Sequence, residues 1–68
     1  MKVSNNISDN IKKLRQEKGY SLEKIARLAD LSLNTVVKIE SGVNKNPTID
    51  TLVKIAKALN VDVNYLIK

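Results

Sequence analysis

The hydrophobic residues of this chain recur at helical spacing, in short runs that polar residues separate. The most informative stretch, residues 21–42, predicts two short helices joined by a tight turn. Ser21 and Ser32 are suited to cap the starts of these helices, and Gly42 can adopt the left-handed conformation that ends the second. Asp30 interrupts the pattern between them. The apolar positions are Ile25, Ala26, Leu28 and Ala29 in the first helix and Val36 and Ile39 in the second. This arrangement is a helix-turn-helix.

Three further helices are expected around this pair, and no strand. Their boundaries are marked by Ser8 or Asp9 before and Gly19 after the first, Thr48 before and Asn60 after the second, and Asp62 before the third. Their core-facing residues are Ile11 and Leu14, then Ile49, Leu52, Ile55, Ala56 and Leu59, then Val61 and Leu66. The fold class is therefore all-α, a compact five-helix domain. We expect residues 1–7 to form a flexible N-terminal arm and residues 8–68 to form the domain.

The second helix of the pair keeps one side free for a partner. At about 100° per residue, Val36 and Ile39 fall on one side of it. The opposite side presents Leu33, Asn34, Val37 and Lys38. An amide can pair with adenine, an ammonium can donate to guanine, and an aliphatic group can touch a thymine methyl. The pattern therefore favours a face that reads bases in the major groove over an ordinary solvated helix surface.

Charge and composition agree with a nucleic-acid partner and argue against enzyme chemistry. The 68 residues include 12 Lys and Arg against 7 Asp and Glu, a net charge of +5 that attracts phosphate backbones. The chain has no Cys and no His, so we expect no metal, no cofactor and no enzymatic activity. No apolar run has the length of a membrane span or signal-peptide core, which predicts a cytoplasmic protein without a membrane partner.

Several motifs occur in a specific order: LR near the end of the first helix, then G-x-S, IA, S-x-x-T-V-x-K-I-E-S-G, P-T-I-D-T-L and ALNVDVNYL. In this order they resemble the Cro/CI family of helix-turn-helix regulators, the XRE-like or lambda-repressor-like DNA-binding domains. The resemblance covers residues 8–67, nearly the whole chain. It implies a five-helix domain that binds double-stranded operator DNA as a homodimer and regulates nearby promoters, in most cases as a repressor.

The resemblance also implies roles for individual residues. Base reading falls to Leu33, Asn34, Val37 and Lys38, and phosphate binding to Ser21, Ser32, Asn44, Lys45 and Asn46. Arg15 and Glu40 fall where some relatives have a partly buried ion pair that ties the first helix to the end of the recognition helix. The dimer contact is expected around the last helix, at Val63, Tyr65 and Ile67. Val63 and Ile67, four residues apart, are expected on one exposed helical face.

The sequence departs from the family pattern at the starts of the two paired helices. Leu22 and Leu33 stand where relatives often have glutamine, so an apolar pair replaces a polar one and Leu33 can meet a thymine methyl. Asp30 stands at a turn position that usually holds glycine and is expected to adopt a positive φ. Thr48 replaces a basic residue of some relatives, which predicts weaker phosphate anchoring there.

Two alternatives to a DNA-binding regulator keep the same fold. A protein-interaction module would be favoured if Leu22, Leu33 and Val37 formed one exposed apolar patch. An antitoxin component would add a toxin partner to DNA binding. A further regulatory protein partner also stays open, because the chain shows no ligand-binding domain of its own.

Overall fold

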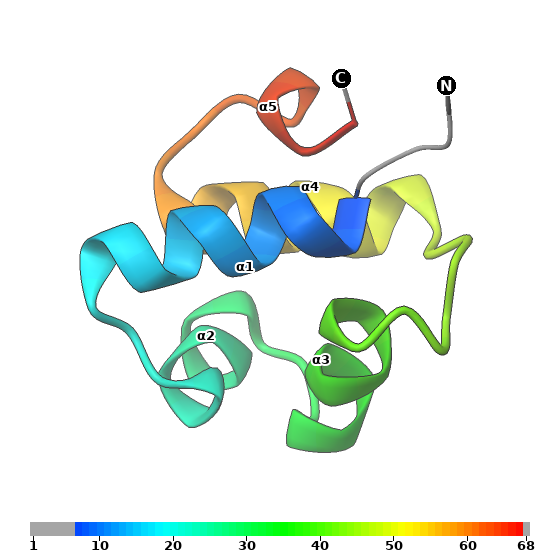
Figure 1. Cartoon of the computed structure of the whole chain (residues 1–68), viewed down its shortest axis with the longest axis horizontal. Helices are drawn as coiled ribbons and strands as arrows, with labels where there is room; N and C mark the ends of the chain where they lie inside the picture. Colours follow the sequence, from blue (N-terminus) through cyan, green and yellow to red (C-terminus); the bar gives the residue numbers. More distant parts are fainter. Residues whose placement is uncertain (1–6, 68) are drawn as a thin grey trace.

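The computed structural model describes residues 7–67, and all the regular secondary structure in this range is helical (Figure 1). The helices are α1 (Ile7–Lys18), α2 (Leu22–Ala29), α3 (Leu33–Glu40), α4 (Ile49–Leu59) and α5 (Asn64–Ile67). In Figure 1, α1 crosses in front of α4, with α5 on one side of this pair and α2 and α3 on the other. The all-α, five-helix prediction is confirmed for this range. The expected N-terminal arm lies, apart from Ile7, outside the described residues, as does Lys68.

Side-chain caps begin three of the helices, as the sequence predicts. Ser21, Ser32 and Thr48 each accept a hydrogen bond from the backbone N–H three residues later, at 3.0, 3.1 and 3.2 Å. Asp30 and Asn60 end α2 and α4 in the left-handed conformation, with φ of 58° and 59°. Aspartate and asparagine tolerate this conformation better than most L residues. The short turn that results brings α3 directly against α2.

The core is a single cluster to which all five helices contribute. Its buried hydrophobic members are Ile11, Ile25, Ala26, Ala29, Val36, Ile39, Leu52, Ile55, Ala56, Leu59 and Leu66. Burying a large aliphatic side chain contributes roughly 1.5–3 kcal/mol of stability. The small Ala26 on α2 and Val36 on α3 are both buried in this cluster, consistent with a close crossing of the paired helices.

Some helix-level predictions were wrong. Ser8 and Asp9 do not cap α1, because the helix already includes Ile7, whose side chain packs against the core. Ile49, expected in the core stripe of α4, is 63% exposed at the first position of that helix. Leu28 is also exposed, since it lies at the edge of the buried stripe of α2.

Candidate nucleic-acid interface

The predicted base-reading residues share the exposed side of α3. Its inner side is held in the core by Val36 and Ile39, which are 1% exposed. The outer side presents four exposed side chains: Leu33, Asn34, Val37 and Lys38. α3 therefore exposes an amide, an ammonium and two aliphatic groups to solvent, while its buried residues hold the helix in place.

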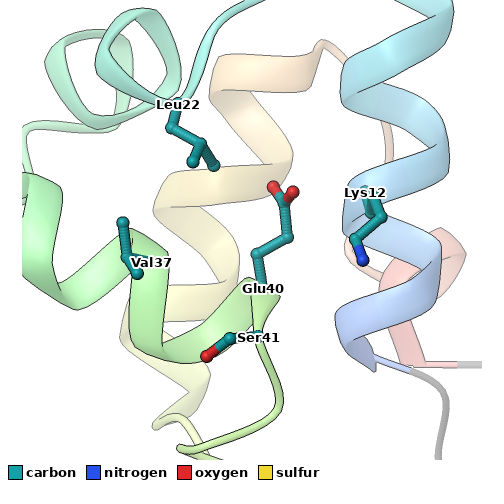
Figure 2. A pocket seen from close by; sticks show the side chains of 5 residues that line it. All are labelled: Lys12, Leu22, Val37, Glu40 and Ser41. Atoms are coloured by element: carbon teal, nitrogen blue, oxygen red, sulfur yellow. The ribbon is translucent and has the colours of Figure 1, made fainter.

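A shallow cleft of about 170 Å³ adjoins this face between α1, α2 and α3 (Figure 2). The side chains that line it are Lys12, Leu22, Val37, Glu40 and Ser41. Figure 2 shows Leu22 pointing from α2 toward α3, on which Val37 lies. The apolar surface of α3 thus continues onto α2. Lys12 brings a cation to the α1 side of the same cleft, a placement that only the packing of three helices reveals.

Arg15 and Glu40 form a bidentate ion pair between α1 and the end of α3. Arg15 Nε and Nη2 donate to the two carboxylate oxygens of Glu40 at 2.8 and 2.7 Å. The two side chains are only 15% and 7% exposed. The hydrogen bond to Glu40, and then its negative charge, raise the pKa of Arg15 against the opposing effect of burial. The pair therefore braces the C-terminal end of α3 against α1.

A third hydrogen bond extends this brace to the segment between α1 and α2. Arg15 Nη1 donates to the backbone carbonyl of Tyr20 at 2.7 Å. The sequence could not single out Tyr20 for this role, because every residue carries a backbone carbonyl. All three guanidinium nitrogens of Arg15 therefore donate a hydrogen bond. Through them Arg15 connects α1 both to the segment before α2 and to the end of α3.

The loop after α3 folds back on the helix, and two of its backbone N–H groups donate hydrogen bonds within the chain. The Asn44 N–H donates to the Lys38 carbonyl at 2.9 Å, and the Asn46 N–H donates to Asn44 Oδ1 at 3.1 Å. These two N–H groups are therefore already bonded within the chain. The side chains of Asn44, Lys45 and Asn46 are all exposed.

The two serines at the helix starts are exposed, and each is also a cap. Ser21 Oγ accepts from the Lys24 N–H, so its own hydroxyl hydrogen can point outward. Ser32 Oγ donates to Thr35 Oγ1 at 2.8 Å, so the hydroxyl hydrogen left at this helix start is that of Thr35. The start of α2 therefore keeps a hydroxyl donor on Ser21, and the start of α3 keeps one on Thr35.

The C-terminal segment differs from the sequence-based expectation in one respect. Val63 precedes α5 and packs against the core, so it does not share an exposed helical face with Ile67. The exposed hydrophobic residues of the segment are instead Tyr65 and Ile67, at 51% and 43%. Leu66 is fully buried, as predicted, and its carbonyl accepts a hydrogen bond from Asn10 Nδ2 at 3.0 Å. This bond fastens α5 to α1.

Two kinds of site are absent from residues 7–67. None of the helices there has the length and apolar character that crossing a membrane requires. Likewise, no three or more Asp and Glu side chains in that range are grouped so that they could hold a metal ion.

Two capped helices joined by a tight turn, the second with its outer face exposed, define a helix-turn-helix domain. The helix-turn-helix family model matches residues 11–66, well over half of the chain. The chain belongs to this family, in its Cro/CI-type, XRE-like branch.

The relatives are transcription regulators by name. The chain is 38% identical over 61 residues to the HTH-type transcriptional regulator SinR of Bacillus subtilis, an alignment that covers 90% of this chain and 55% of that protein. The chain thus spans about half the length of this curated relative.

Solved structures of relatives share the fold closely. The structure of SinR, described as the master regulator for biofilm formation, in complex with DNA superposes with a TM-score of 0.84 at 38% identity, covering 88% of this chain and 95% of that one. The restriction-modification controller protein C.AhdI from Aeromonas hydrophila gives 0.85 at 30% identity, covering 90% and 91%.

Proposed function

We propose that this chain is a sequence-specific DNA-binding domain of a transcriptional regulator, which reads the major groove with α3. The observation that carries this proposal is the division of α3 into a buried side and an exposed side with base-reading chemistry. A helix of about 10–12 Å diameter fits a major groove about 12 Å wide. Leu33, Asn34, Val37 and Lys38 are the base-reading residues of this proposal.

Contacts with phosphate hold the helix in register. The proposed phosphate-binding residues are Ser21, Ser32, Asn44, Lys45 and Asn46, which are all exposed at helix starts or in the loop after α3. A net charge of +5 supplies long-range attraction to DNA. The solved complex of the relative SinR with DNA supports the same partner for this chain.

We further propose that the protein acts as a homodimer on a palindromic operator and represses transcription there. Four base-reading residues specify too few base pairs to find one site among ~10⁶ or more competitors in a genome. Two copies of α3 on one face of the DNA, about 34 Å apart, double the number of base pairs that are read. The exposed Tyr65 and Ile67 are the proposed dimer contact.

We further infer that the protein binds DNA without catalysing a reaction. We place it in the cytoplasm, where the DNA is. The support for the first inference is chemical: the sequence contains neither Cys nor His, and the buried carboxylate of Glu40 is fully engaged by Arg15.

Selection of sites from random duplex DNA, followed by fluorescence anisotropy on the selected site, tests the proposal. If each half-site engages about four phosphates, the affinity of a dimer falls with salt at a log–log slope on the order of −7. A folded chain that binds no DNA, or binds it with almost no salt dependence, would overturn the proposal. That result would favour the alternative of a protein-interaction module, in which Leu33 and Val37 meet a partner protein.

A further inference from the structure

The exposed face of α3, which consists of Leu33, Asn34, Val37 and Lys38, has two side chains that cannot form hydrogen bonds with a base. Leu33 and Val37 are 41% and 38% exposed, although both are aliphatic. They lie one helical turn apart, between the buried side of α3 and the polar edge formed by Asn34 and Lys38. Any partner that covers this face therefore meets a row of hydrocarbon beside a row of hydrogen-bonding groups.

The hydrocarbon row is wider than α3 alone. Val37 lines the cleft together with Leu22, whose side chain points from α2 into the cleft (Figure 2). The carboxylate of Glu40 in the same cleft is neutralised by Arg15, so it presents no unpaired charge there. Lys12 and Ser41 line the other parts of the cleft, so it is the part lined by Leu22 and Val37 that favours an apolar group on the partner over a polar one.

In the major groove of unmodified DNA, the C5-methyl group of thymine is the apolar feature of the base edges. A cytosine methylated at C5 carries the same group at the same place. We propose that Leu33 and Val37 recognise C5-methyl groups, so that the protein binds 5-methylpyrimidines more tightly than their unmethylated counterparts. This inference rests on the proposed DNA-binding function and names the chemistry that its site selects.

The spacing of the two side chains sets the expected pattern on DNA. Residues four apart on a helix are separated by about 6 Å along its axis, and a helix that lies in the major groove reads successive bases with side chains about one turn apart. Each half-site should therefore contain two methyl-sensitive positions at neighbouring base pairs. Removing one buried methyl group should weaken binding about fourfold.

The experiment uses the whole chain and the duplex selected from random DNA. At every pyrimidine position of the half-site, four duplexes are compared by fluorescence anisotropy: thymine, deoxyuridine, cytosine and 5-methylcytosine. Thymine against deoxyuridine changes only the methyl in an A-paired base, and 5-methylcytosine against cytosine changes only the methyl in a G-paired base. We expect a preference of about fourfold for the methylated member of both pairs at the two sensitive positions.

Protein variants assign each methyl contact to a side chain. Leu33→Ala should abolish the preference at one position, and Val37→Thr, which exchanges a methyl for a hydroxyl in the same shape, should reduce it at the other. Leu28→Ala is the matched control, because Leu28 is a leucine of similar exposure, 48%, on α2. Leu28→Ala should keep both preferences. Circular dichroism verifies that all three variants are folded.

The outcomes separate this inference from the function on which it rests. Specific binding with equal affinity for methylated and unmethylated members at all positions overturns the inference and leaves the proposed function standing. A preference for thymine over deoxyuridine without one for 5-methylcytosine over cytosine also overturns it, because recognition would then depend on more than the methyl. Equal binding to all random duplexes would instead overturn the proposed function.

Discussion

Breaking the Arg15–Glu40 pair should cost this domain a large share of its stability. The pair has two charge-assisted hydrogen bonds of 2.7 and 2.8 Å, and its side chains are at least 85% removed from solvent. Replacing one partner leaves the other charge buried and uncompensated, at about 3–5 kcal/mol. A domain of 68 residues has a free energy of unfolding of about 3–10 kcal/mol. Arg15→Leu and Glu40→Leu should each therefore remove about a third or more of this free energy of unfolding.

The double variant provides the decisive comparison. With both charges removed, no buried ion is left, so Arg15→Leu with Glu40→Leu should be more stable than the sum of the two single losses predicts. Urea unfolding followed by circular dichroism measures all four proteins. The exposed Asp50–Lys54 pair, with 3.9 Å between its charged atoms, is the matched control and should give a coupling below about 1 kcal/mol. Losses at Arg15 and Glu40 that are small and strictly additive would refute the reasoning.

Three further predictions concern the reading face, the dimer and the turn. Asn34→Ala should cost about 1–3 kcal/mol on the selected site and relax one base position, whereas Lys45→Ala should weaken all duplexes alike; equal losses for Asn34→Ala on specific and random DNA would exclude it from base reading. Tyr65→Glu or Ile67→Glu should abolish binding to a palindrome but preserve half-site binding and the far-ultraviolet spectrum, and an unfolded variant would instead assign the residue to the core. Asp30→Val should lower the free energy of unfolding by about 1–2 kcal/mol, because a β-branched residue resists a φ of 58°, while Asp30→Gly should not.

The local signals in the sequence predicted most of the fold. Ser21 and Asn60 were identified from capping chemistry, which depends on a few neighbouring residues, whereas the positive φ of Asp30 was expected from the turn position of the family. The errors arose where distant packing decides. Helical periodicity places Ile49 near the core stripe, but it cannot show whether another element covers the first turn of a helix. Two capping residues near the start of α1 were likewise overridden because the helix already includes Ile7.

The candidate site divides in the same way. The exposed side of α3 follows from counting 100° per residue, so Asn34 and Lys38 could be placed from the sequence. The cleft beside it could not, because Lys12 and Ser41 meet there only after three helices have packed. Resemblance to the family, and not spacing, suggested that Arg15 pairs with Glu40.

The two-sided construction of α3 bears on how such a protein can change in evolution. The side chains that hold the helix are buried or braced, while those proposed to choose the DNA sequence are exposed. Exposed substitutions away from such braces usually change stability by no more than about 0.5 kcal/mol. Leu33, Asn34, Val37 and Lys38 can therefore be exchanged almost independently of folding. After gene duplication, one copy of this domain could acquire a new operator by a few substitutions on the exposed face of the eight-residue helix α3. The buried residues that hold α3 in place would remain unchanged.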